Sequence, residues 1–64
     1  MRLRELRRER ALSQQDIERM TGVAQSTLSA LESGKRDAQP RTVRKLADAL
    51  GVEPRELMRR SGDV

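Results

Sequence analysis

The sequence contains no cysteine and no histidine, so it has neither the thiols for a disulfide nor the usual ligands of a structural zinc ion. It also has no phenylalanine, tryptophan or tyrosine, which leaves leucine, isoleucine, valine, methionine and alanine to build a core. A chain of 64 residues forms one domain with a modest core, because a domain of this size buries roughly 60% of the surface that its unfolded chain exposes. Stability must therefore come from helix packing, helped by dimerisation or by a bound partner.

Long apolar runs are missing as well. No run could cross a bilayer, and the charged N-terminal stretch has no apolar segment that resembles a signal peptide. We therefore expect a soluble cytoplasmic protein without a membrane partner. Because histidine, cysteine and clustered carboxylates are all absent, no nucleophile, general base or metal site is supported, and we expect neither an enzyme nor a bound cofactor or metal.

Basic residues exceed acidic ones, with 14 Lys and Arg against 10 Asp and Glu and a net charge of +4. The excess lies in two segments, because residues 1–12 sum to +3 and residues 34–46 to +4. The segment between them, residues 13–33, sums to −2, and residues 47–64 sum to −1. Basic charge thus flanks the centre of the chain on both sides, where phosphate contacts would be expected if the centre enters a nucleic-acid groove.

Apolar spacing and capping residues predict an all-α domain over residues 1–60, with a frayed tail at 61–64. The expected helices cover about 2–10, 14–20, 25–32 and 40–50, and a short one begins near 53–54. Ser13 is a good N-cap for the second helix, with Asp16 in the capping-box position, and Gly22 ends that helix. The side chains expected inside are Leu3, Leu6, Ile17, Met20, Val23, Leu28, Leu31, Val43, Leu46, Ala47 and Leu50.

Residues 14–33 are the most informative segment, because they indicate two short helices joined by a tight turn at 21–23. The turn needs a residue that tolerates positive φ, and Gly22 supplies it. The second helix has short polar side chains where a solvated helix usually has Lys and Glu, namely Gln25, Ser26, Thr27 and Ser29. Such side chains on a protruding helix can exchange hydrogen bonds with base edges in the DNA major groove. The alternative is a polar helix face that binds nothing.

Further side chains are candidates for DNA phosphates. The first helix of the pair aims its N-terminus at a phosphate, and the amide of Gln14 can donate there. Lys35, Arg36 and Arg41 follow the second helix, and Arg41 can also reach a narrow minor groove. The arginines of the first helix are expected to form a solvated face, with Arg10 the best placed of them to touch a phosphate.

Several segments in this order resemble the helix-turn-helix family of the phage repressors and Cro proteins, also called the xenobiotic-response-element group. They are LRELR from Leu3, LSQ from Leu12, TGVAQSTLS from Thr21, LESGK from Leu31 and LADALGV from Leu46. The resemblance covers about Leu3 to Leu57. It implies a compact five-helix, lambda-repressor-like fold in which the second and third helices form the helix-turn-helix.

The resemblance also implies roles for individual residues. Base reading falls to Gln25, Ser26 and Ser29, with Thr27 partly against the protein, and DNA-backbone contacts fall to Gln14, Ser33, Lys35, Arg36 and Arg41. Arg7 and Glu32 are expected to form a largely buried ion pair. The chain departs from the family at Glu18, where a small residue is usual and where the side chain must lean outward or find a partner such as an arginine. It departs again at Ala11, where glycine often closes the first helix, so a slightly strained or differently shaped turn is expected there.

These features predict a sequence-specific double-stranded DNA-binding transcriptional regulator, associated with the nucleoid and acting as a repressor on a pseudo-palindromic operator. One such domain touches few base pairs, so we expect a homodimer on DNA. The interface candidates are Val52, Pro54, Leu57 and Met58, of which Val52 and Leu57 are expected to belong to the core and Met58 to a small two-fold interface. The alternative function is that of an antitoxin or anti-repressor, which would act chiefly through a protein partner. The motif also occurs in longer chains, so these residues can be part of a larger protein.

Overall fold

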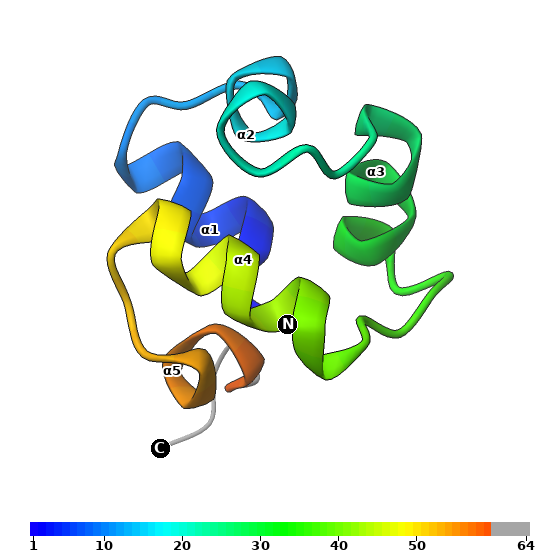
Figure 1. Ribbon diagram of the computed structural model, residues 1–64, viewed down its shortest axis with the longest axis vertical. Coiled ribbons are helices and arrows are strands. Elements are labelled where there is room, and N and C mark those ends of the chain that lie inside the picture. Colours follow the sequence, from blue (N-terminus) through cyan, green and yellow to red (C-terminus); the bar gives the residue numbers. More distant parts are fainter. Residues whose placement is uncertain (60–64) are drawn as a thin grey trace.

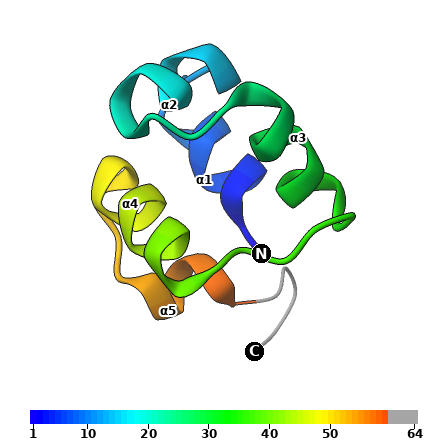
Figure 2. The same ribbon diagram turned by 45° about the vertical axis from the view of Figure 1, so that its right-hand side comes forward.

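The computed structural model describes residues 1–59, which contain five α-helices and no strand (Figures 1 and 2). The helices are α1 (Leu3–Glu9), α2 (Gln14–Thr21), α3 (Gln25–Ser33), α4 (Pro40–Leu50) and α5 (Pro54–Met58). The all-α prediction is confirmed, and each predicted helix end lies within one residue of the observed one. The tail predicted at 61–64 lies outside the described residues. Within residues 1–59, the helices are all too short and too polar to pass through a lipid bilayer.

Local capping interactions explain where the second helix starts and ends. The Ser13 hydroxyl accepts a hydrogen bond from the Asp16 backbone N–H at 3.0 Å, and the Asp16 carboxylate accepts one from the Ser13 backbone N–H at 2.8 Å. The backbone N–H and the hydroxyl of Ser13 hold the pKa of Asp16 below its ordinary value. At the other end, Gly22 adopts a left-handed conformation with φ of 78°. The capping box and the glycine stop are both as predicted.

The core draws on all five helices. Its buried side chains are Leu3, Leu6, Ile17, Leu28, Leu31, Val43, Leu46, Ala47, Leu50 and Leu57. Helix α4 contributes four of them and contacts α1, α2 and α5, so that α2 and α5 lie at opposite ends of the molecule with α4 between them (Figures 1 and 2). Helix α3 packs on α1 and α2 instead. This arrangement leaves the outer side of α3 open.

Two expectations about apolar side chains need correction. Met20 was predicted to point inward, and this is wrong, because the side chain is 52% exposed beside Lys45 and Asp48 of α4. It lies three residues after Ile17, at the edge of the buried side of α2. Leu57 was a candidate for a dimer interface, but it is completely buried in the core and cannot contact a second subunit. Val52 is half-buried and packs against the core.

The turn between α1 and α2 contains Ala11 with φ of 54°, so an alanine takes the left-handed conformation that favours glycine. The chain reverses there within a few residues, and the Leu12 backbone N–H donates to the Arg7 carbonyl at 3.0 Å. Of the two outcomes expected at this position, a strained turn or a differently shaped one, the structure has the strained turn.

Replacing Ala11 by glycine should raise the free energy of unfolding by about 0.5–1 kcal/mol. The left-handed conformation costs a residue with a Cβ roughly 1–2 kcal/mol, and the greater freedom of unfolded glycine offsets part of that gain. The matched control is Gly22→Ala, which should be destabilising because Gly22 has φ of 78°. A Cβ there would meet open space, so the loss of stability would come from the backbone conformation alone. Urea titrations of the three proteins measure both effects. An Ala11→Gly protein no more stable than the parent would mean that the turn is unstrained.

Candidate nucleic-acid interface

Helices α2 and α3 form the predicted helix-turn-helix, and their turn is held by hydrogen bonds of its own. The Thr21 hydroxyl donates to the Ile17 carbonyl at 2.7 Å and accepts from the Val23 backbone N–H at 3.1 Å. The Gly22 backbone N–H donates to the Glu18 carbonyl at 2.7 Å. In both views α3 lies at the periphery of the molecule, beside α2 (Figures 1 and 2). The turn thus fixes α3 as an outer helix.

The side chains predicted to read bases share the outer face of α3. Gln25, Ser26 and Ser29 are all exposed, whereas Leu28 and Leu31 on the inner face are buried in the core. Thr27 is half-buried and lines a small hollow between α3 and the start of α4, as expected of a side chain turned partly toward the protein. Amide and hydroxyl groups therefore project together from one side of a helix whose other side is fixed.

The N-terminus of α3 has no cap of its own. Its N-cap residue is Ala24, and its first turn contains no acidic residue. The Glu18 carboxylate of α2 accepts a hydrogen bond from the Gln25 backbone N–H at 3.4 Å. Within the described residues, the partner of Glu18 is therefore a backbone N–H of α3, whereas the sequence suggested an arginine. A helix N-terminus of this kind carries partial positive charge and favours an anion.

Most of the residues predicted to contact the DNA backbone lie on the surface near α3. Lys35, Arg36 and Arg41 are exposed just beyond its C-terminus, and Ser33 is exposed at its last position. Arg10 is different, because its guanidinium donates to the Leu50 carbonyl at 2.6 Å and to the Leu6 carbonyl at 3.0 Å. A phosphate contact from Arg10 would compete with these two hydrogen bonds. No pattern in the sequence indicates the bond to Leu50, which joins the end of α1 to α4.

Arg7 and Glu32 form the ion pair predicted from the resemblance. Arg7 Nε lies 2.9 Å from one carboxylate oxygen of Glu32, and Arg7 Nη2 lies 3.1 Å from the other. The side chains are 13% and 1% exposed, respectively. Burial alone would raise the pKa of Glu32, but the hydrogen bonds from Arg7, Arg4 and Gln14 outweigh it and hold that pKa below its ordinary value. Glu32 is therefore ionised at neutral pH, and the same pair raises the pKa of Arg7.

Sequence reasoning missed two further donors to Glu32. Arg4 Nε lies 3.2 Å from the Glu32 carboxylate, and Gln14 Nε2 lies 3.3 Å from it. The Arg4 contact could have been expected, because Arg4 and Arg7 are three positions apart and share a face of α1. The Gln14 contact depends on how α2 crosses α3 and has no local signal.

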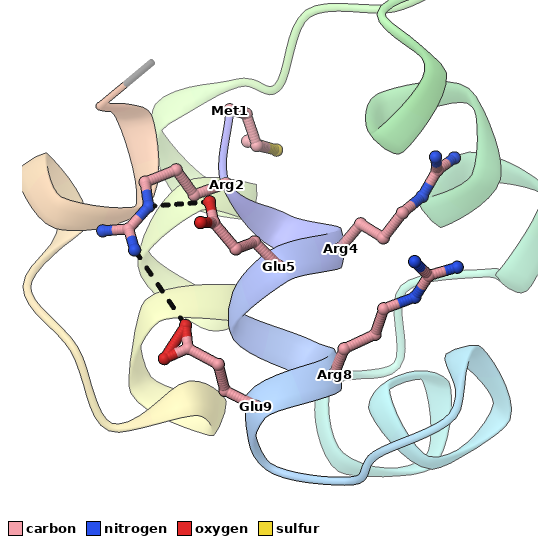
Figure 3. A pocket seen from close by; sticks show the side chains of 6 residues that line it. All are labelled: Met1, Arg2, Arg4, Glu5, Arg8 and Glu9. Atoms are coloured by element: carbon pink, nitrogen blue, oxygen red, sulfur yellow. Dashed lines mark hydrogen bonds and ion pairs between the residues drawn. The ribbon is translucent and has the colours of Figure 1, made fainter. Parts of the chain in front are cut away.

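The outer side of α1 is an open, charged hollow (Figure 3). Arg2 turns toward Glu5 and Glu9, while Arg4 and Arg8 extend to the other side of the helix (Figure 3). Arg2 also pairs with Glu56 of α5, so it ties the two helices together. The prediction that the arginines of α1 form a solvated face is therefore only partly correct. Arg8 is exposed, but several of the other arginines are bound to other helices.

Replacing Arg7 by methionine should lower the free energy of unfolding by about 3–5 kcal/mol, because the change removes one partner of a buried pair and leaves the other charged. Urea denaturation at neutral pH measures the loss. The matched control is Arg8→Met, at an exposed position of the same helix, which should change stability by less than about 0.5 kcal/mol. Equal unfolding midpoints for the two variants would show that the pair contributes nothing to stability.

Comparison with known proteins places this geometry in a family. The Helix-turn-helix family matches residues 3–57. An uncharacterized HTH-type transcriptional regulator of Sinorhizobium fredii, y4dJ, is 45% identical over 53 residues, which cover 83% of this chain and 69% of that protein. The crystal structure of the restriction-modification controller protein C.AhdI from Aeromonas hydrophila is similar to this fold, with a TM-score of 0.83 and 43% identity over 88% of this chain and 85% of that chain.

Two similar proteins come from Bacillus subtilis. The uncharacterized HTH-type transcriptional regulator RghRB is 40% identical over 63 residues, and the HTH-type transcriptional repressor RghR is 39% identical over 63 residues. Each alignment covers 97% of this chain. The chain spans 45% of the length of RghRB and 47% of that of RghR, so these two relatives contain further sequence beyond the shared domain.

Proposed function

Since this chain belongs to the Cro/C1-type helix-turn-helix family of DNA-binding transcriptional regulators, we propose that it is a repressor that binds a pseudo-palindromic operator as a homodimer. The observation that carries the proposal is the outer face of α3, where Gln25, Ser26 and Ser29 are exposed together while Leu28 and Leu31 on the inner face are buried. A relative named as a repressor, RghR, supports the direction of regulation. Repression would follow from occlusion, because a protein on the operator excludes other proteins from the same DNA.

Each group of side chains has a different part in this mechanism. Gln25 is the residue that distinguishes between bases, because a glutamine amide can form hydrogen bonds with both the N6 amino group and N7 of adenine. The hydroxyls of Ser26 and Ser29 can form hydrogen bonds with more than one kind of base. The DNA-backbone contacts come from the second N–H of the Gln14 amide, whose other N–H donates to Glu32, and from Ser33, Lys35, Arg36 and Arg41 after the exposed face of α3. Such contacts set the register of the protein on the duplex and carry no sequence information themselves.

The homodimer would form through an apolar surface between α4 and α5. We define this surface by the apolar residues Ala38, Pro40, Val43, Pro54 and Met58, which line one shallow groove together with Arg44. Met58 is 48% exposed, although a methionine side chain gains by leaving water. Two copies joined here could read two half-sites about one helical turn apart, which a single domain of this size could not do.

Replacing Gln25 by alanine should relax the preference at one position in each half-site and weaken operator binding by about 1–3 kcal/mol. Lys35→Ala is the control, because loss of a phosphate contact should weaken all sequences alike and flatten the dependence of affinity on salt. Selection of binding sites from random DNA identifies the preferred sequence, and titrations at several salt concentrations separate the two effects. If Gln25→Ala changes neither affinity nor preferred sequence, α3 does not read bases through this residue.

Replacing Met58 by glutamate should weaken self-association by at least about tenfold, because a carboxylate would replace the exposed apolar side chain of the proposed interface and would lose its hydration there. The matched control is Met20→Glu, at the other strongly exposed methionine, which lies outside the apolar surface between α4 and α5. Sedimentation velocity, with and without operator DNA, compares the two variants. If both variants self-associate equally strongly, the two subunits do not meet at the apolar surface between α4 and α5.

A further inference from the structure

A chain of polar contacts leads from the buried ion pair to the proposed base reader. Gln14 Nε2 donates to the Glu32 carboxylate at 3.3 Å, and Gln25 Nε2 lies 3.5 Å from Gln14 Oε1. Glu32 is at the same time bound by Arg7 of α1 and is 1% exposed, so its carboxylate cannot turn away. The chain thus begins at a fixed group within the protein and ends on the outer face of α3.

The direction of each amide in this chain follows from what its neighbour can accept. An ionised carboxylate accepts hydrogen bonds and donates none, so Gln14 must turn its NH₂ group toward Glu32. The carbonyl oxygen of the Gln14 amide then lies on the side of Gln25. A carbonyl oxygen accepts and does not donate, so Gln25 in turn must present its own NH₂ group to Gln14. This chemical requirement decides between the two orientations that exchanging the amide oxygen and nitrogen would give.

We propose that Glu32 is a positioning residue for base reading, because its carboxylate sets the direction of the Gln14 amide and, through it, that of Gln25. The inference rests on the proposed function, in which Gln25 reads a base. With one N–H turned toward Gln14, Gln25 keeps its second N–H and its oxygen for the DNA. Those two groups match N7 and the N6 amino group of adenine. The ion pair therefore contributes to base preference as well as to stability.

Removing the fixed acceptor should weaken the preference for adenine without abolishing binding. A Gln25 side chain that is free to turn loses conformational entropy when it pairs with adenine. This entropic cost weakens the adenine complex most, because both groups of the amide are engaged only there. Ordering a side chain of this kind at an interface weakens a complex by roughly two- to tenfold. We therefore expect a loss of adenine preference of roughly two- to tenfold.

The test compares Arg7→Met/Glu32→Leu with Arg7→Met/Glu32→Gln in the full chain. Both remove the charged pair, and replacement of a complete buried pair by uncharged residues is often tolerated. Only the glutamine variant keeps an oxygen there, and because Arg4 donates to the same position as Gln14, the oxygen of that amide and not its NH₂ group should face Gln14. Dissociation constants are measured for operator duplexes that differ only at the base pair assigned to Gln25. The leucine variant should lose the stated two- to tenfold in adenine preference, and the glutamine variant should keep most of it.

A second arm repeats the comparison in a Gln14→Ala background. Since Glu32 acts through Gln14, the difference between the leucine and glutamine variants should disappear there. The inference is overturned if the two variants discriminate equally with Gln14 present, or if leucine weakens all duplexes alike. A parent protein that shows no preference at the base pair assigned to Gln25 would overturn the proposed function itself.

The parent protein provides a measurement that does not depend on the variants folding. In the absence of DNA, nuclear Overhauser effects should connect the Gln14 NH₂ protons with the guanidinium protons of Arg7 or Arg4, because all these groups donate to the Glu32 carboxylate. Effects from the Gln14 NH₂ protons to the Gln25 side chain alone would mean that the amide points the other way, and would overturn the inference.

Discussion

The arrangement of the first three helices depends on one buried carboxylate. Glu32, at the end of α3, is contacted by Arg7 and Arg4 of α1 and by Gln14 of α2. An isolated charge at a site that is 1% exposed would cost several kcal/mol, so Glu32 tolerates only those helix positions in which its donors remain in reach. Apolar contacts are less directional and allow small shifts between helices. The carboxylate of Glu32 thus helps to fix the angle at which α2 and α3 cross.

The same principle extends to the rest of α1, whose arginines connect it to other parts of the chain. Arg2 pairs with Glu56 of α5, and Arg10 donates to the Leu50 carbonyl at the end of α4. Together with the Arg7–Glu32 pair, these contacts fix both ends and the middle of α1. A core without any aromatic side chain offers few large interlocking shapes, and directional contacts from arginine compensate for this.

Local chemistry explains most of what the sequence could predict, and tertiary contacts explain the remainder. The capping box at Ser13 and the glycine stop at Gly22 need only neighbouring residues, so they could be predicted along with the five helices. The exposure of Met20 could not, because an apolar residue at the edge of a helix face is buried or exposed according to the neighbouring helix. Among the site residues, the exposed face of α3 follows from helical periodicity, whereas the bonds of Arg10 and Gln14 depend on where α4 and α3 lie.

The charge of residues 13–33 at first argues against contact with DNA, because this segment sums to −2 although it contains the proposed reading helix. The structure reduces this difficulty, because Glu32 is paired with Arg7 and Arg4, Asp16 is paired with Arg19, and none of the three acids lies on the outer face of α3. Asp16 accepts from Ser13 in the capping box, Glu18 accepts from the Gln25 backbone N–H, and Glu32 is buried against Arg7. Carboxylates that are bound in this way serve the fold, while the exposed face of α3 carries only neutral polar groups. The basic segments on either side can then attract phosphates without an opposing charge on the outer face of α3.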